Sequence, residues 1–329
     1  MNNPPSNDDV VGESHSMTDA VEDFLKADHE SSPERTYSGF VAIVGRPNVG
    51  KSTLVNALVG QKVSIVSDKP QTTRSAIRGI LEEPGRQAVL IDTPGYHKPR
   101  TLLGQRLNDV VRNAWADVDL AVFMVDAKAG VGRGDERVAR DLRSAGGPAL
   151  CVVNKIDLAT REQVAQALAA ASQLGDFEEF VPLSARTGNN LRLLHDMILE
   201  RLPEGPLYYP PGTRTDQPPP LFVAELIREK LLQRTREEVP HSIAVVTDDF
   251  EERDDGLLEI HALVFVERDS QKGIVIGKGG QTLKTVGTEA REEIEVLFGR
   301  RVFLDLRVKV EKDWQRRAYA LERLGFVPH

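Results

Sequence analysis

The sequence predicts an α/β fold, a mostly parallel sheet with helices on both faces, followed by a small α+β domain. Between residues 37 and 202, short apolar runs alternate with segments of helical periodicity, which indicates strands joined by crossover helices. A proline-rich stretch follows at residues 203–220, and it cannot form a helix interior or a central strand. Beyond it the pattern changes. We therefore predict a disordered acidic tail (1–36), an α/β domain (37–202), a linker (203–220) and a C-terminal domain (221–329).

Composition narrows the class of protein. A chain of 329 residues is long enough for about two domains. Its one cysteine, Cys151, lies in an apolar run and fits a protein of the reducing cytosol. Residues 1–35 hold nine acidic and two basic side chains of a chain whose net charge is −8, so the rest is almost neutral and has no bulk basic field. No apolar run approaches the roughly 20 residues of a membrane span, and residues 1–35 lack the pattern of a signal peptide. We expect a cytoplasmic protein.

The expected elements of the first domain follow from apolar runs for strands and from i, i+3, i+4 spacing for helices. Turn composition at residues 83–86 predicts a hairpin, and the stretch 61–75 has no clean periodicity, so we expect a loop there. The predicted strands are 40–44, 77–81, 87–91, 120–125, 149–153 and 180–183. The predicted helices are 50–59, 103–116, 136–145, 162–173 and 191–202.

In the C-terminal domain the same patterns predict helices and strands in a different order. The predicted elements are a helix at 222–235, strands at 242–248 and 257–267, a helix at 281–298, a strand at 302–310 and a helix at 314–324. This order indicates a small α+β domain.

The segment Gly45-Arg46-Pro47-Asn48-Val49-Gly50-Lys51-Ser52-Thr53 stands between the first strand and the first helix. In that context G-x-x-x-x-G-K-[ST] indicates a phosphate-binding loop rather than an incidental glycine turn. Its two glycines let several backbone N–H groups face one anion at a helix N-terminus. Lys51 supplies positive charge for the β and γ phosphates, and the Ser52 hydroxyl is a predicted ligand of Mg²⁺.

Asp92-Thr93-Pro94-Gly95 follows a later predicted strand. Alone, this tetrapeptide is an ordinary turn. Beside a phosphate loop, Asp92 is a candidate to hold Mg²⁺ through a water molecule, and the Gly95 N–H is a candidate to reach the γ-phosphate. The loop after it would then respond to hydrolysis.

Asn154-Lys155-Ile156-Asp157 indicates which base is bound. The Asp157 carboxylate can accept two hydrogen bonds from guanine N1 and its exocyclic amine, whereas adenine offers neither donor in that arrangement. Asn154 would brace the loop, Lys155 would lie along the ring, and Ser184-Ala185 would offer an N–H to guanine O6. Because Gly45, Asp92, Asn154 and Ser184 all come at or after strand ends, they should meet at one edge of the sheet. The complete set predicts a GTPase.

Ile276-Gly277-Lys278-Gly279-Gly280 precedes the long predicted helix 281–298, after a short apolar turn. A lone G-x-x-G is weak evidence, but this context is typical of the loop with which KH domains clamp about four nucleotides of a single strand. Lys278 and Lys284 can meet phosphates. The sequence therefore predicts that the C-terminal domain is a type II KH domain that binds RNA.

Taken together, these motifs resemble the bacterial Era GTPases, within the TrmE–Era–EngA-like group, over roughly residues 38 to 325. Gln71-Thr72-Thr73-Arg74 is a further characteristic segment. The resemblance implies a Ras-like P-loop GTPase domain and a C-terminal KH domain. It also implies binding to the 3′ end of small-subunit ribosomal RNA, assembly of the small ribosomal subunit and peripheral contact with the inner face of the cell membrane. We expect a monomer.

Details of hydrolysis also follow from the resemblance. Thr72 and Thr73 are candidates for the threonine that ligates Mg²⁺ only with GTP, and we predict Thr73, because related GTPases carry it directly before a basic residue. Asn48 resembles a residue that helps hold K⁺ in relatives. Tyr96 stands where many GTPases have a water-orienting Gln. No obvious arginine finger is readable, because Arg46 and Arg74 are each compatible with a solvated loop charge. We predict slow intrinsic turnover.

The predicted site residues fall into four groups. The GTP-binding residues are Gly45, Arg46, Pro47, Asn48, Val49, Gly50, Lys51, Ser52, Thr53, Asp92, Thr93, Pro94, Gly95, Tyr96, Asn154, Lys155, Ile156, Asp157, Ser184 and Ala185. The metal ligands are Ser52, Thr73 and Asp92 for Mg²⁺, and the catalytic residues are Lys51, Thr73, Gly95 and Asn48, the last as a K⁺ site. The RNA-binding residues are Ile276, Gly277, Lys278, Gly279, Gly280 and Lys284.

Two other functions fit the same motifs. In the first, the GTPase acts in cell-cycle signalling and its KH domain docks a protein or a membrane. In the second, the protein is an RNA-binding scaffold locked on nucleotide that hardly turns over. Stimulation of hydrolysis by RNA would favour the ribosomal function over both.

Overall fold

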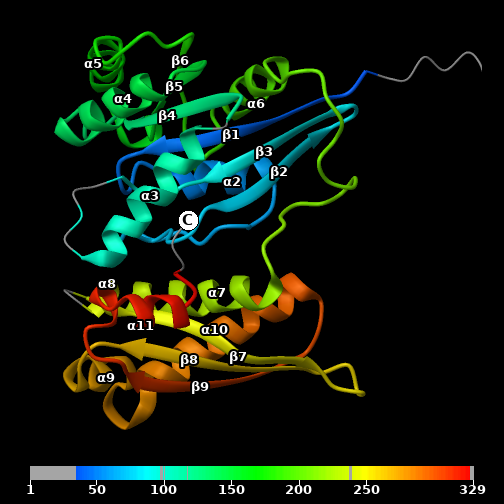
Figure 1. Ribbon diagram of the computed structural model, residues 1–329, viewed down its shortest axis with the longest axis vertical. Helices are drawn as coiled ribbons and strands as arrows, with labels where there is room; N and C mark the ends of the chain where they lie inside the picture. The colour runs from blue at the N-terminus through cyan, green and yellow to red at the C-terminus, as the bar shows by residue number, and fades with distance from the viewer. Residues whose placement is uncertain (1–34, 97–98, 100, 117, 237–238, 327–329) are drawn as a thin grey trace, which may run out of the picture.

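The computed structural model describes residues 35–326 except 97–98, 100, 117 and 237–238. The predicted acidic tail therefore lies outside the described residues, apart from its last two. Figure 1 shows two units stacked along the long axis, joined by an extended segment on one side. Among the described residues, no helix is long and apolar enough to span a membrane.

The upper unit contains a six-stranded sheet in the order β2-β3-β1-β4-β5-β6. All neighbouring strands in it are parallel except β2 and β3, which form an antiparallel pair. Its strands are β1 (Tyr37–Gly45), β2 (Ile77–Glu83), β3 (Arg86–Asp92), β4 (Leu120–Asp126), β5 (Ala149–Asn154) and β6 (Glu179–Pro182). Its helices are α2 (Lys51–Val59), α3 (Leu102–Ala116), α4 (Arg133–Ala145), the 3-10 helix η1 (Ile156–Leu158), α5 (Arg161–Ala171) and α6 (Leu191–Glu200).

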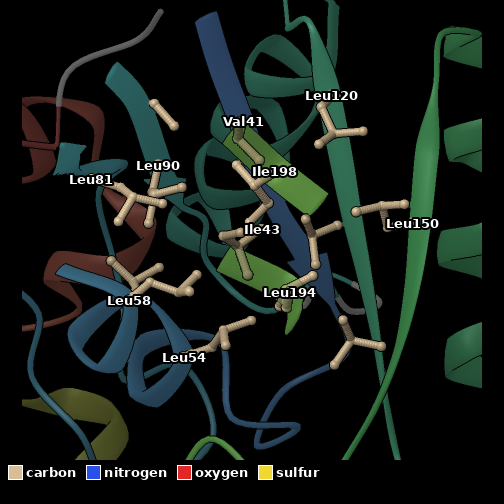
Figure 2. Close-up of a cluster of buried hydrophobic side chains, with 14 of the residues drawn as sticks. Val41, Ile43, Leu54, Leu58, Leu81, Leu90, Leu120, Leu150, Leu194 and Ile198 are labelled. Carbon is tan, nitrogen blue, oxygen red and sulfur yellow. The ribbon is translucent and has the colours of Figure 1, made fainter. Parts of the chain in front are cut away.

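Both faces of this sheet are covered, because alternate residues of the central strands point to opposite sides. Val41 and Ile43 of β1 belong to the core under α2 and α6, whereas Ala42 and Val44 belong to the core that includes residues of α3, α4 and α5. Figure 2 shows side chains of the first of these cores, including those of Val41 and Ile43 from β1, Leu54 and Leu58 from α2, and Leu194 and Ile198 from α6. The predicted mostly parallel α/β fold is confirmed.

The lower unit is a three-stranded sheet with helices packed on it. The order is β7-β8-β9, with β7 and β8 antiparallel and β8 and β9 parallel. Residues of α7 and α10 form a core against one face, and the C-terminal segment covers part of the other. Its elements are α7 (Pro219–Arg234), α8 (Val239–Ser242), β7 (Ala244–Glu252), β8 (Leu258–Val266), α9 (Asp269–Ile276), η2 (Lys278–Gly280), α10 (Gln281–Phe298), β9 (Val302–Val310), η3 (Trp314–Arg316) and α11 (Ala318–Arg323).

The structure corrects three local expectations. The apolar turn before Gly277 is the end of helix α9; the glycine inside that helix, Gly273, weakened its periodicity. The single last helix is two short ones, η3 and α11, because Arg317 between them has an extended backbone with φ −105° and ψ 118°. Trp314 in η3 is fully buried and donates from Nε1 to the Ser242 carbonyl at 2.9 Å. Pro219 and Pro220, assigned to the linker, form the first turn of α7, where proline needs no N–H partner.

The proline-rich segment is fastened to the edge of the upper sheet. The Ile80 N–H donates to the Arg214 carbonyl at 2.9 Å, and Gly79 and Thr215 form an antiparallel bridge. Gln87 is fully buried, and its amide oxygen accepts the N–H groups of Tyr208 and Tyr209, both at 2.9 Å. Its Nε2 donates back to the Tyr209 carbonyl at 3.0 Å. This segment is therefore a strap along the sheet rather than a free tether.

Replacing Gln87 with Ala should detach this strap locally. Three backbone groups lose their partner, so we expect the free energy of unfolding to fall by about 1–3 kcal/mol and proteolysis within 203–218 to accelerate. Urea denaturation and limited proteolysis measure the two effects. The control is Gln173→Ala, because Gln173 is exposed and its side chain donates to the Ser172 hydroxyl at 3.4 Å, away from the strap. Equal cleavage in wild type and Gln87→Ala would contradict the role of Gln87.

Candidate functional site

A cleft of about 680 Å³ opens at the carboxyl ends of the upper sheet. Gly45, Asp92 and Asn154 are the last residues of β1, β3 and β5, and Ser184 follows β6 by two residues. The shared edge is the one expected for a parallel sheet. The cleft is lined by Pro47, Asn48, Gly50, Lys51, Ser52, Thr53, Ile65, Val66, Ser67, Asp68, Gln71, Thr72, Thr73, Gly95, Asn154, Lys155, Asp157, Leu158, Ala185 and Arg186.

The phosphate loop depends on backbone conformations that favour glycine. Gly50 has φ 103°, and a Cβ there would stand 2.4 Å from Nδ2 of Asn154. The loop encloses the Lys51 ammonium, which donates to the carbonyls of Gly45 and Arg46 at 3.2 and 3.1 Å. Burial lowers the pKa of Lys51 to about 8, and the charge of Asp92 opposes that shift. A negatively charged ligand at the loop would favour the protonated lysine.

Four oxygen-bearing side chains converge near Lys51. The Thr73 Oγ1 lies 3.0 Å from the Ser52 Oγ and donates to the Asp92 Oδ2 at 3.4 Å. The Ser64 hydroxyl donates to the same carboxylate oxygen at 2.7 Å. Asp92 is fully buried, and burial raises its pKa even though these hydroxyls and Lys51 oppose the shift. Its Oδ1 has no hydrogen-bond partner among the described residues. This oxygen set suits a hard divalent cation.

The other threonine of the pair points elsewhere. The Thr72 Oγ1 donates to the Lys69 carbonyl at 2.7 Å. Of the two candidates, Thr73 is the one whose hydroxyl faces Ser52 and Asp92.

Asn154 ties the far end of the cleft to the phosphate loop. Its Nδ2 donates to the Val49 carbonyl at 2.8 Å, and its Oδ1 accepts the Ala185 N–H at 3.0 Å. Lys155 has φ 65°, and its ammonium donates to the Asn48 carbonyl at 2.5 Å and pairs with Asp126 at 2.7 Å. The side chain of Lys155 thus extends from the base loop to the phosphate loop.

The Asp157 carboxylate is exposed at this end of the cleft. The Ser184 hydroxyl donates to its Oδ1 at 2.7 Å and accepts the Thr187 N–H at 3.1 Å. The serine thereby fixes the orientation of the Asp157 carboxylate, which can then accept hydrogen bonds from N–H donors on the edge of a planar base.

Several predicted residues do not line the cleft. Tyr96 is buried in the core, its ring centroid 5.6 Å from that of Trp115. Arg46 is not a solvated charge, because it pairs with the buried Asp135 at 3.1 Å. The others outside the lining set are Gly45, Val49, Asp92, Thr93, Pro94, Ile156 and Ser184.

The sequence motifs missed part of the lining. Residues 65–68 and 71 belong to the loop between α2 and β2, and Leu158 and Arg186 follow the base motifs. Gln71 belongs to the characteristic segment Gln71-Thr72-Thr73-Arg74, whereas no periodicity or motif marks the others. Their only signal is their position in the chain next to recognised residues.

A second candidate site is a shallow groove of the lower unit. It lies where α10 starts and faces β9, and it continues the glycine loop at Gly277 to Gly280. Gly279 has φ 60° with open space around it, and Lys278 is exposed. Of the predicted RNA-binding residues, Gly280 and Lys284 line the groove, together with Leu283, Gly287, Thr288, Arg291, Leu304 and Leu306, which the sequence motifs did not indicate.

Comparison with known proteins matches both units. Residues 40–155 match a family described as 50S ribosome-binding GTPase, and residues 238–315 match the KH domain family. GTPase Era of Mycobacterium tuberculosis (strain H37Rv) is 54% identical over 297 residues, 88% of this chain and 99% of the relative. GTPase Era of Heliobacterium modesticaldum is 49% identical over 293 residues, 89% and 98% of the two chains.

Two solved structures match with a TM-score of 0.85 and 39% identity. One is a variant of Era from Aquifex aeolicus bound to GDP and AlF4⁻, and the match covers 89% of this chain and 100% of the other. The second is Era in complex with MgGDPNP and nucleotides 1506–1542 of 16S ribosomal RNA, where the match covers 89% and 99%. Since relatives about half identical match over almost their whole length, and both domain families are present in order, the chain belongs to the Era family of GTPases and is a GTP-hydrolysing enzyme.

Proposed function

We propose that the protein is a GTP-dependent switch that binds the 3′ end of small-subunit ribosomal RNA through its KH domain and assists assembly of the small ribosomal subunit. The observation that carries the proposal is the presence, in one chain, of a nucleotide cleft and a KH groove in a fold that it shares with Era bound to MgGDPNP and a 16S RNA fragment. The matched family description names the 50S subunit, so the assignment to the small subunit rests on that relative and on the resemblance of the motifs.

Guanine recognition is assigned to Asp157, with Asn154 as its brace. The exposed carboxylate, oriented by Ser184, can accept from N1 and the exocyclic amine, and the Ala185 loop is held by Asn154 at the distance of a hydrogen bond. An adenine base would leave the carboxylate without donors. The phosphate loop Gly45–Thr53 would hold the phosphates, with Lys51 closest to the β and γ groups.

Mg²⁺ fits the oxygens of Ser52, Thr73 and Asp92. The support is the unpartnered Oδ1 of the buried Asp92, since a buried carboxylate without a compensating charge is costly. The ion would neutralise charge on the phosphates when bound. Thr73 would hold it only while a γ-phosphate is present, and the Gly95 N–H, in a backbone that approaches Pro47, would contact that phosphate.

Turnover is proposed to be slow. Tyr96 is buried against Trp115 and cannot orient a water molecule, and neither Arg46 nor Arg74 is free to reach the phosphates, because both are engaged elsewhere. Asn48 donates from Nδ2 to the Asp68 carbonyl at 2.7 Å, which holds its side chain beside the phosphate loop with the amide nitrogen toward that carbonyl. The K⁺ site at Asn48 rests on the resemblance to relatives, and the ion would supply charge that an arginine finger otherwise gives.

RNA binding is assigned to the glycine loop and the groove behind it. Ile276 to Gly280 would let a nucleic-acid backbone approach closely, with Lys278 and Lys284 at phosphates. In the described part of the chain, the lower unit bonds to the upper one through α7, α8, the middle of α10 and the C-terminal segment. The start of α10 and the glycine loop are not among these contacts. The groove is therefore accessible to a strand while Thr73 faces the metal position.

The remaining expectations stay predictions that rest on resemblance: a cytoplasmic location, peripheral contact with the inner membrane face and a monomeric state. A second candidate function keeps the GTPase and uses the KH domain to dock a protein or a membrane in cell-cycle signalling. RNA dependence separates the two.

Hydrolysis should depend on K⁺. At equal ionic strength we expect the rate in KCl to exceed that in NaCl by roughly tenfold, because the larger ion supplies charge beside the γ-phosphate. Asn48→Ala should remove the difference. Phosphate release under single-turnover conditions measures it, and equal wild-type rates in the two salts would rule out the K⁺ site.

RNA should stimulate hydrolysis through the glycine loop. We expect a short RNA matching the 3′ end of small-subunit ribosomal RNA to raise the rate of wild-type protein, and Gly279→Asp to abolish the increase, because a carboxylate repels the clamped phosphates. The control is Gly256→Asp, since Gly256 also has a positive φ, 77°, and open space around it but lies in a distant turn.

Three outcomes decide between the functions. Loss of stimulation in Gly279→Asp alone supports the proposal. Full stimulation in Gly279→Asp would show that the glycine loop does not hold the RNA. A wild-type protein that neither binds the RNA nor responds to it would favour the docking function.

A further inference from the structure

The loop between α2 and β2, residues 60–76, runs between the upper sheet and the lower unit (Figure 1), and part of it lines the nucleotide cleft. We refer to it as the connecting loop. On one side its Ser64 and Thr73 hydroxyls contact Asp92. On the other side Ile65 is fully buried in the core of the lower unit, and the Val66 N–H donates to Glu229 of α7 at 2.8 Å. The same loop thus belongs to both units.

Ion pairs fasten the start of this loop to two helices of the lower unit. The Lys62 ammonium pairs with Glu229 of α7 at 2.6 Å and with Glu293 of α10 at 2.5 Å. Glu229 is only 3% exposed. Leaving the Glu229 carboxylate buried without its cation would cost free energy. Separation of the units would therefore expose both charges to water, and the start of the loop would no longer be held against the lower unit.

The end of the loop is held on both sides of Thr73. The Thr72 carbonyl accepts a hydrogen bond from Nη2 of Arg228 in α7. The Arg74 guanidinium donates to the carbonyls of Ile243 and His241, at 2.5 and 2.9 Å. Thr73 is therefore the residue between two backbone positions that the lower unit fixes.

Arg74 is the more informative of these arginines. It is 4% exposed, which excludes the solvated loop charge with which the sequence was compatible. Its Cζ lies 5.6 Å from the ring centroid of Trp314, which is fully buried. Burial first, and the nearby Arg228 second, lower the pKa of Arg74 to about 9. It remains charged at neutral pH.

This buried pair of guanidinium groups is incompletely compensated. Nε of Arg74 and Nη1 of Arg228 have no hydrogen-bond partner among the described residues. Water would satisfy both groups if the units moved apart, so the docked arrangement gains less from this contact than a fully bonded interface would. Such a contact suits a two-state element whose equilibrium a ligand can shift.

We propose that Arg74 is a positioning residue that makes the preference for GTP over GDP depend on docking of the KH domain. Docking holds the backbone at Thr72 and Arg74, and this keeps the Thr73 hydroxyl beside Ser52 and Asp92. The residues that bind GDP lie in the phosphate loop and the base loops, and the hydrogen bonds at Thr72 and Arg74 do not involve these loops. The coupling is reciprocal: if docking places Thr73 beside Ser52 and Asp92 and so favours binding of a γ-phosphate, then a bound γ-phosphate also favours docking. The proposal rests on the proposed role of Thr73 and extends it to the C-terminal domain.

The test measures binding rather than turnover. In the full-length protein with Mg²⁺, titration calorimetry gives the dissociation constants of GDP and of a non-hydrolysable GTP analogue. We expect Arg74→Ala to weaken the triphosphate analogue by about tenfold, within the range typical of coupled sites, and to leave GDP unchanged. Arg74→Lys, which keeps a cation that can donate to carbonyls, should restore part of the loss.

Two further variants separate positioning from local damage. Arg228→Ala alters only the KH domain, yet it should produce the same selective loss, and the double variant should lose little more than either single one, because both act on one docking equilibrium. The matched control is Arg78→Ala: Arg78 lies just beyond the loop, is half exposed and pairs with Asp216 at 2.8 Å, away from the interface. It should bind both nucleotides as wild type does.

Each outcome decides the proposal. Unchanged affinity for the triphosphate analogue in Arg74→Ala, or an equal loss for both nucleotides, would overturn it, the second because a merely structural role has that signature. The same proteins titrated with the RNA test the proposed function separately. If RNA affinity depends on the bound nucleotide to the same extent in wild type and in Arg74→Ala, only the role of Arg74 is overturned. If the wild-type protein does not bind the RNA, only the ribosomal function is overturned.

Discussion

The buried carboxylate of Asp92 is the point on which the nucleotide cleft depends. It is fully excluded from water at the end of β3, and hydroxyls from the connecting loop converge on one of its oxygens. Burial raises the pKa of a carboxylate in that setting unless positive charge comes near. Lys51 supplies part of that charge, and the open oxygen leaves room for more. The phosphate loop, the connecting loop and the segment after β3 therefore all depend on positive charge close to the Asp92 carboxylate.

Much of this arrangement could be predicted from the sequence, because the governing interactions are local. The phosphate loop needs glycine where φ is positive, and the strands are apolar on both faces because helices cover both. Asn154, Asp157 and Ser184 follow strand ends, so the parallel sheet brings them to one edge whatever the details of the loops. The glycine loop of the KH domain was visible for the same reason, as a short motif before a long amphipathic helix.

What could not be predicted depends on contacts between distant segments. Arg74 looked like a solvated charge because nothing near it in sequence is acidic or aromatic; the carbonyls and the indole that surround it come from residues some 170 to 240 positions later in the chain. Tyr96 looked like a residue beside the phosphates, and only the tertiary structure shows that its ring belongs to the core against Trp115. The predicted helix 314–324 is likewise divided into η3 and α11, and its buried Trp314 bonds to Ser242, which lies 72 positions earlier in the chain.

The strap along the edge of β2 has a consequence for the geometry of any domain motion. Its bonds to β2 and β3 extend as far as Asp216, whose carboxylate pairs with Arg78 at 2.8 Å, and α7 begins at Pro219. Only a few residues therefore remain to act as a pivot, and two of them border prolines with restricted backbone angles. A KH domain that undocks would therefore stay on a short arm about a fixed point, and its redocking would be an intramolecular event with a high effective concentration, independent of how much protein is present. The same strap covers an edge strand that would otherwise offer unpaired backbone groups to a second molecule.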